Sequence, residues 1–194
     1  VLIERVFDQR SLLDSSVIWY LSFFIIAGIL VFIAIRNKLD FKAGIGKDLI
    51  WFFLCAFLGV LFFSTEGIVM IRYLGFPPNP FPGWSALLSP VYQLGFAAVP
   101  EEPLFRGFLW GGLRKLGLKD FWILIIQALL FSVGHLYYLN TDHGLFFLGF
   151  VFIDALIMGL LVWKSRSLST SMAFHGFANG SAIFQYWIYS LVLR

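Results

Sequence analysis

Three charged side chains lie within six residues of an otherwise apolar stretch: Glu101, Glu102 and Arg106. An ionisable group at the centre of a bilayer costs about 2.5–3.5 kcal/mol on insertion scales, so each one requires a compensating reason. Glu102 and Arg106 are four residues apart, which places them on one helix face where they can form an ion pair. Glu101 points about 100° away from that face and has no partner in its own helix. We therefore interpret Glu102 and Arg106 as a structural pair and Glu101 as a carboxylate available for chemistry.

Further polar side chains lie on two other apolar segments. His135 comes late in one of them, and His175 and Asn179 are four residues apart on a later one. A single intramembrane histidine is usually a hydrogen bonder between helices. One unpaired glutamate, two histidines and an asparagine together can activate a water molecule and stabilise an oxyanion. The combination favours a hydrolytic site.

The remaining polar candidates have a structural interpretation. We expect His143, which follows Asp142 in a loop, to be a solvated surface residue. Five more polar residues fall in apolar segments and are interpreted as hydrogen bonders in the helix packing: Glu66, Gln93, Gln127, Asp154 and Gln185.

The composition places these residues in a membrane protein. The 194-residue chain is 60% hydrophobic, 20% aromatic and only 13% charged, with a mean hydropathy of +0.86. Soluble domains average about 25% charged residues. These values exclude a disulfide scaffold, a disordered tail and a nucleic-acid module, and Cys55 has no second cysteine to pair with. We predict one all-α integral-membrane domain, 1–194, that is a polytopic bundle of transmembrane helices in contact with the lipid bilayer.

Six uncharged or nearly uncharged runs approach the roughly 20 residues that a helix needs to span a bilayer. They are 17–35, 49–71, 84–113, 121–139, 144–163 and 169–193. The third run is too long for one span and contains Pro90 and Pro100, so we expect an entry made of a loop and a helix, followed by a helix that begins at Pro100. The proline-rich stretch 75–83 is expected to be an irregular loop.

The basic residues predict an orientation. If the N-terminus is outside, the loops on the cytoplasmic side carry nine Lys and Arg residues and the outer segments four. The positive-inside rule then favours basic loops in the cytoplasm. A chain this short, with few soluble appendages, fits a prokaryotic plasma membrane. Because the sequence begins with Val1 rather than Met, we allow for an upstream segment.

Helix lengths give a test of whether the polar residues meet. At about 1.5 Å per residue, Glu101 lies about 18 Å from Leu113 and His135 about 21 Å from Phe121, so their depths agree. His175 is only about 9 Å beyond Ser169, one to two turns too shallow. Either the polar stretch 164–171 dips into a cavity, or the predicted helix ends are wrong.

Taken in order, the motifs resemble those of a known family. Glu-Glu-x-x-x-Arg at 101–106, Phe-x-x-x-His at 131–135 and His-x-x-x-Asn at 175–179 are similar to the motifs of the CPBP intramembrane proteases. This family comprises CAAX-processing and bacteriocin-processing enzymes and is also called Abi. The resemblance covers about residues 82–189, more than half of the chain.

The resemblance implies proteolysis of a membrane-associated peptide or protein inside an intramembrane cavity. By this likeness, Glu101 is the general base, His135 shares the water and shuttles its proton, and His175 and Asn179 hold the oxyanion. Glu102 and Arg106 would fix the helix and the orientation of Glu101. We favour a reaction without a metal or other cofactor. The alternative is a zinc-dependent protease in which Glu101, His135 and His175 bind the ion.

Two other functions stay open at this point. One is a non-catalytic immunity or scaffold protein of the same family. The other is a small proton-coupled transporter, since intramembrane acids and histidines also build proton relays. No nucleic-acid partner is expected. The sequence leaves open the substrate, its prenylation and the oligomeric state.

Overall fold

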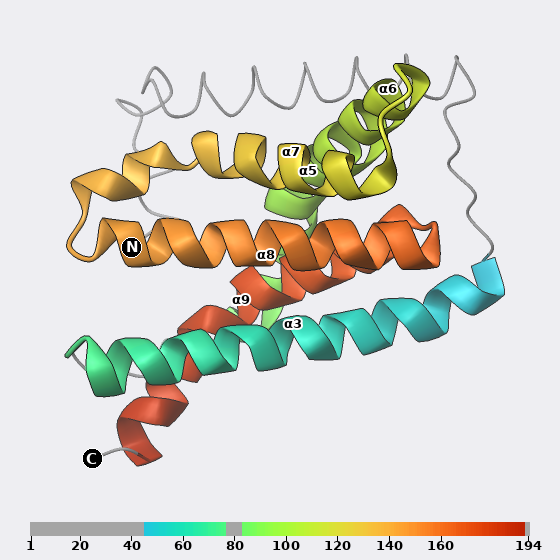
Figure 1. The fold of residues 1–194 in the computed structure, drawn as a ribbon. Coiled ribbons are helices and arrows are strands. Elements are labelled where there is room, and N and C mark those ends of the chain that lie inside the picture. The colour runs from blue at the N-terminus through green and yellow to red at the C-terminus, as the bar shows by residue number, and fades with distance from the viewer. Residues whose placement is uncertain (1–44, 77–82, 193–194) are drawn as a thin grey trace, which may run out of the picture.

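The computed structural model describes residues 45–76 and 83–192, and these ranges contain helices and no strands. The predicted all-α class is therefore confirmed for this part of the chain. Figure 1 shows the arrangement of the helices. The elements are α3 (Ile45–Tyr73), η2 (Trp84–Leu88), α4 (Ser89–Gln93), η3 (Leu94–Ala98), α5 (Val99–Glu102), η4 (Pro103–Leu109), α6 (Trp110–Lys115), α7 (Asp120–Val133), η5 (Leu136–Asn140), α8 (Gly144–Ser165) and α9 (Leu168–Val192).

Helix α9 is the element around which the others pack. It contacts α3 along much of its length, and it also contacts α4, η3 and α8 (Figure 1). Helix α7 packs against α8. The main buried cluster joins α3, α7, α8 and α9 through small and medium side chains, among them Cys55, Ala128, Ala155, Met158 and Phe174. The polar residues of α9 are therefore surrounded by helices.

Two helices in the described ranges are long and apolar enough to cross a membrane, Leu49–Tyr73 and Gly144–Ser165. They correspond to the second and fifth predicted spans. The prediction of six spans is not confirmed: 17–35 lies outside the described residues, and α7 has only 14 residues. On α3, Leu49, Phe53, Phe57 and Leu61 repeat every four residues and are exposed. An exposed apolar stripe with this helical period, uncovered by the described residues, suits contact with lipid.

The expected break before Pro100 is wrong. Residues 84–115 are helical throughout, with η3 and η4 forming π-helical turns before Pro100 and from Pro103 onward. A proline inside an α-helix removes a hydrogen bond, and its ring clashes with the carbonyl of residue i−4. Wider π turns let the helix absorb the two rings without ending. The motif that begins at Glu101 therefore lies inside a continuous helical segment.

Two glycines of α9 bring it close to this segment. A Cβ atom at Gly176 would lie 2.8 Å from the Leu94 Cα, and one at Gly180 would overlap Pro90. Glycine at these positions allows backbone to approach backbone, as in small-residue interfaces between membrane helices. His175 and Asn179 each precede one of these glycines. The close approach thus places both side chains beside the segment that carries the glutamates.

The first turn of α9 resolves the mismatch in depth. Ser167, Thr170 and Ser171 are buried, and the Thr170 hydroxyl donates to the Ser167 carbonyl at 2.7 Å. The Thr170 hydroxyl also lies 3.0 Å from that of Ser165. Three residues of the stretch 164–171 are therefore inside the protein, whereas Lys164 and Arg166 are exposed. His175 does not have to be near a surface.

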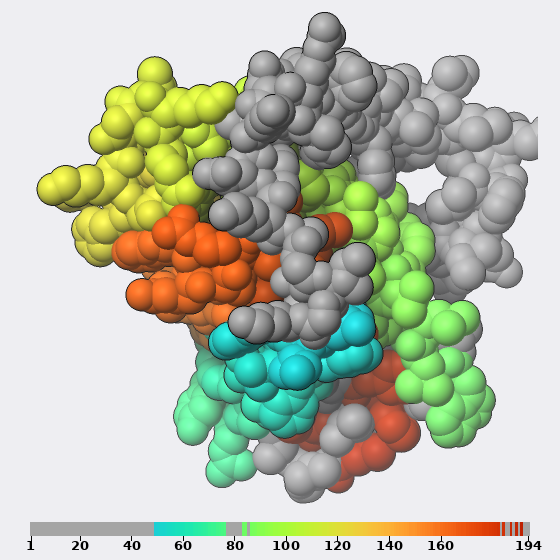
Figure 2. Space-filling model, turned by 90° about the vertical axis from the view of Figure 1, so that its right-hand side faces the viewer, coloured from blue at the N-terminus to red at the C-terminus, as the bar shows by residue number. Residues whose placement is uncertain are grey.

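Basic residues from two predicted cytoplasmic loops lie at one end of the molecule. Arg114 and Arg166 both approach Asp120, at 2.6 and 3.9 Å. Figure 2 views this end, where the start of α3 (cyan), the end of α8 (orange) and the α6–α7 region (yellow-green) come together. The loops assigned to one side by charge are thus on one side of the fold.

Candidate active site

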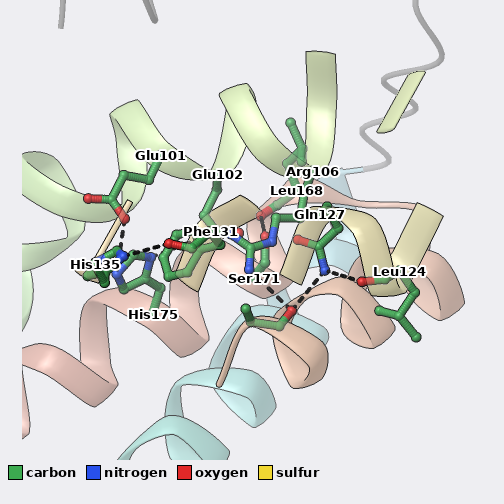
Figure 3. A network of polar contacts seen from close by, with 11 residues as sticks. Glu101, Glu102, Arg106, Leu124, Gln127, Phe131, His135, Leu168, Ser171 and His175 are labelled. Carbon is green, nitrogen blue, oxygen red and sulfur yellow. Dashed lines mark hydrogen bonds and ion pairs between the residues drawn. The ribbon is translucent and has the colours of Figure 1, made fainter. Parts of the chain in front are cut away.

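Glu102 is fully buried and joins two segments of the chain. Its Oε1 accepts a hydrogen bond from Arg106 Nη1 at 3.1 Å and one from His175 Nδ1 at 2.9 Å. The first bond confirms the predicted pair of residues 102 and 106. The second reaches α9 and was not predicted. Figure 3 shows both glutamates directed from one helical segment toward His175.

Arg106 connects this pair to two further helices. Its Nη2 donates to the Ala155 carbonyl on α8 at 3.2 Å, and its guanidinium lies 4.5 Å from the centre of the Phe131 ring on α7. Gln127 donates to the same carbonyl at 3.0 Å, which agrees with its structural interpretation. A buried cation held by a carboxylate, a carbonyl and an aromatic face is well compensated.

Glu101 is less enclosed and less well paired than Glu102. Its side chain is 22% exposed, and its Oε2 lies 3.9 Å from His175 Nε2. This distance is longer than a hydrogen bond. Oε2 is itself buried and has no hydrogen-bond partner among the described residues. The carboxylate thus presents an unused acceptor directly to the imidazole.

The hydrogen bond to Glu102 decides which nitrogen of His175 carries a proton. Glu102 is ion-paired with Arg106 and can only accept, so Nδ1 of His175 is the donor. Nε2 then faces the Glu101 carboxylate. An added proton on Nε2 would be stabilised by that carboxylate and would make Nε2 a donor.

His135 is held in the complementary way. Its Nδ1 lies 2.8 Å from the Phe131 carbonyl, which can only accept, so Nδ1 is again protonated. The ring packs between Phe131, at 4.7 Å between centroids, and Tyr138, at 6.2 Å and nearly parallel. Nε2 of the neutral ring is therefore the free acceptor, fixed in direction by the carbonyl and the two rings.

A cavity of about 80 Å³ lies beside these histidines. A water molecule requires about 10–15 Å³ on this measure, so several fit. His135, His175 and Asn179 line the cavity, whereas Glu101 lies beside His175 rather than on its lining. Three of the four residues predicted to be catalytic therefore share one space, and the fourth is 3.9 Å from one of them.

Two carboxylates also line this cavity, Glu66 on α3 and Asp154 on α8. Both were interpreted from the sequence as structural hydrogen bonders. The sequence did contain a sign of function, because an acid in an apolar membrane segment is by default a candidate functional residue. No motif connected them with the histidines, which are far away in sequence. Of the other polar candidates, His143 is exposed, as expected, and the side chain of Gln185 is outside the described residues.

The residues do not form a zinc site as they stand. A catalytic zinc requires three protein ligands about 2.0–2.3 Å from one point. In the described ranges, no group of three or more His, Cys, Asp or Glu side chains is arranged to hold a metal ion. We therefore assign no step to a metal.

A family model supplies the comparison with known proteins. The model for type II CAAX prenyl endopeptidases, described as Rce1-like, matches residues 83–181. The chain belongs to the Rce1-like family. This match confirms the resemblance to CAAX proteases and spans all three motifs. No curated protein and no solved structure matches the chain.

Family membership also bears on location and activity. Rce1-like proteins are CAAX-type endopeptidases embedded in membranes, and the two long apolar helices are consistent with an integral membrane protein.

Proposed function

We propose that this chain is an integral-membrane endopeptidase in which Glu101 activates water to hydrolyse a peptide bond. The observation that supports this is the position of Glu101 Oε2, which is buried without a hydrogen bond and 3.9 Å from His175 Nε2. A general base must have a free acceptor within reach of the proton that it abstracts, directly or through one water. The Oε2 of Glu102 also lacks a hydrogen bond, but Glu102 is fully buried and its charge is neutralised by Arg106, so it is the weaker candidate for the base.

The two histidines have different tasks in this proposal. His135 presents a free Nε2 to the cavity and takes the proton of the attacking water toward the leaving amine. His175, protonated on both nitrogens, donates from Nε2 to the developing oxyanion. Asn179 lies one turn further along α9 on the same cavity and donates from its amide. Glu102 and Arg106 act as positioning residues for His175, because Glu102 fixes its Nδ1.

The substrate and the location follow from the family rather than from the site. We propose a membrane-associated protein or peptide substrate, and a C-terminal prenylated peptide is the probe indicated by the family description. We place the chain in a prokaryotic plasma membrane with its basic loops in the cytoplasm. The common position of Arg114 and Arg166 beside Asp120 supports one basic side.

The test is cleavage of internally quenched peptides by the purified protein in detergent. Farnesylated and unprenylated versions of a peptide ending in Cys, two aliphatic residues and a variable residue are compared. Glu101→Gln should reduce kcat/KM by about 10²–10⁴-fold, because it removes the general base. His175→Ala should reduce it by about 10²–10³-fold through loss of an oxyanion donor.

The matched control is His143→Asn, since His143 is exposed and asparagine tolerates its left-handed backbone (φ 62°). It should cleave at the wild-type rate. Undiminished cleavage by both Glu101→Gln and His175→Ala would remove the proposed mechanism. A wild-type protein that binds the peptides without cleaving them would favour the non-catalytic scaffold. Loss of cleavage on chelation, restored by zinc, would establish the metal-dependent alternative.

A further inference from the structure

Besides the histidines, two acidic side chains form part of the cavity lining. Glu66 from α3 and Asp154 from α8 line it, and their exposed fractions are only 6% and 8%. None of the three family motifs includes either residue. Asp154 also interacts electrostatically with His175 and Arg106. The two acids thus belong to the site while the proposed hydrolysis makes no use of them.

Among the described residues neither carboxylate has an ion pair of its own, and the charges of Arg106 and His175 act on Asp154 only over a longer distance. Asp154 Oδ1 is buried without a hydrogen-bond partner in the described part of the chain, and Glu66 feels the like charge of Asp154. Arg106 is already engaged by Glu102 and by the Ala155 carbonyl. A buried carboxylate without a partner is costly, and two near one another are costlier. These two carboxylates therefore favour the binding of a positively charged group in the cavity.

The size and the remaining walls of the cavity narrow the kind of cation. About 80 Å³ holds a few waters or one small organic cation, and it is too small for a prenyl chain. Six aromatic side chains complete the lining: Phe62, Phe63, Phe131, Tyr138, Phe147 and Phe150. Aromatic faces attract ammonium groups, most strongly where water is excluded. Acids combined with aromatic rings are the surroundings that suit an alkylammonium group.

We propose that Glu66 and Asp154 bind the α-ammonium group that hydrolysis creates on the leaving peptide. This inference rests on the proposed function. In that reaction the water oxygen bonds to the carbonyl carbon and the C–N bond breaks. One fragment leaves as a carboxylate, and both protons of the water end on the nitrogen as –NH3⁺, the second of them by way of the new carboxylic acid. Overall, peptide and water give one carboxylate and one ammonium, so no other reactant is required.

The position of the two acids in the same cavity as the histidines supports this proposal. His135 and His175, on which the proposed bond cleavage depends, line the same space as the two acids. The new amine therefore forms next to carboxylates, while the new carboxylate is repelled by them. This sets the direction of the substrate, with the C-terminal fragment over Glu66 and Asp154.

The experiment measures binding and does not require cleavage. The probes are the tripeptide amide Val-Ile-Met-NH2 with a free amine and the same peptide with its amine acetylated. Their dissociation constants are measured by calorimetry on purified full-length protein in detergent. We expect the free amine to bind about tenfold more tightly, which corresponds to about 1.4 kcal/mol. In the double variant Glu66→Gln/Asp154→Asn the two constants should agree within about twofold.

Asp142→Asn is the matched control, because Asp142 is an exposed acid in a loop. It should keep the tenfold difference. Equal binding of both peptides to the wild type, or a difference that survives in the double variant, would overturn the inference. A preference for the free amine in a protein that cleaves nothing would keep the site and remove the proposed function. Cleavage without such a preference would keep the proposed function and remove the ammonium site.

Discussion

Two groups of buried acids flank His175, and they differ in what surrounds them. Glu102 is fully buried and shares its Oε1 between Arg106 and His175. Asp154 is nearly as buried, yet its Oδ1 has no hydrogen-bond partner in the described residues and its neighbour Glu66 is another acid. Burial is therefore not what separates them. The difference lies in whether the folded chain itself supplies the partner.

This contrast gives each acid a role. A buried charge whose partners come from other helices stabilises the fold and fixes the orientation of those partners. A buried charge that the fold leaves unpaired lowers stability, and such groups cluster where a ligand or a reaction supplies the missing partner. Glu101 belongs with the second group, because its only ion pair among the described residues is the one with His175 at 3.9 Å. Glu102 also has an Oε2 without a hydrogen bond, but its Oε1 is bonded to two partners.

The largest expected effect on the free energy of unfolding is for Glu102, the acid whose partners come from the folded chain. Glu102→Gln keeps the shape of the side chain but removes the charge that neutralises Arg106, which remains buried at 3% exposure. Breaking one half of a buried ion pair typically costs about 3–5 kcal/mol. We expect a loss of this size in the free energy of unfolding, measured by denaturant titration in mixed micelles. Glu101→Gln is the control and should change it by less than about 1 kcal/mol. Equal losses for both variants would erase the distinction.

Asp154→Asn should act in the opposite direction. It removes an unpaired charge from the cavity, and relieving such a group is expected to gain about 1 kcal/mol of stability. The same titration in mixed micelles measures the change. A clear loss of stability would show that Asp154 has a partner in the folded protein, and the contrast with Glu102 would then fail.

The smallest effect is expected where a paired acid lies near the surface, at the basic end of the molecule. Burial by itself raises the pKa of the Asp120 carboxyl, but hydrogen bonds from Arg114 and Trp110 outweigh it and hold the pKa below its ordinary value. A carboxyl with a lowered pKa stabilises the fold above its unfolded value of about 3.9, and this contribution is lost as the pH falls through the folded value.

Because the pair is partly exposed, its contribution is about 0.2–1 kcal/mol. The thermal midpoint of the wild type should therefore exceed that of Asp120→Asn at pH 7, and the two should converge near pH 3. A gap that stays constant with pH would show that the effect of the substitution is not electrostatic. A gap comparable to that of Glu102→Gln would mean that burial adds nothing to the value of a pair.

The helices and their motifs were largely predictable because both depend on local sequence. Apolar runs of sufficient length predicted α3 and α8 within a few residues. The spacing of four residues predicted the bond of Glu102 with Arg106. The prediction that a helix begins at Pro100 was wrong, because the helix continues through Pro100. The π turns that accommodate the prolines depend on packing against α9 as well as on the local residues.

The sequence by itself determined a membrane-protein composition, an all-helical class and a set of side chains typical of a hydrolytic family. The tertiary structure alone decided which of those side chains form hydrogen bonds and ion pairs with one another. It bonded His175 to Glu102, 73 residues away in sequence, and left Glu101 with a longer contact of 3.9 Å to the same histidine. It also brought Glu66 and Asp154 to the cavity of the histidines. The reason is physical: helix periodicity fixes which residues share a face, whereas the packing of helices fixes which faces meet.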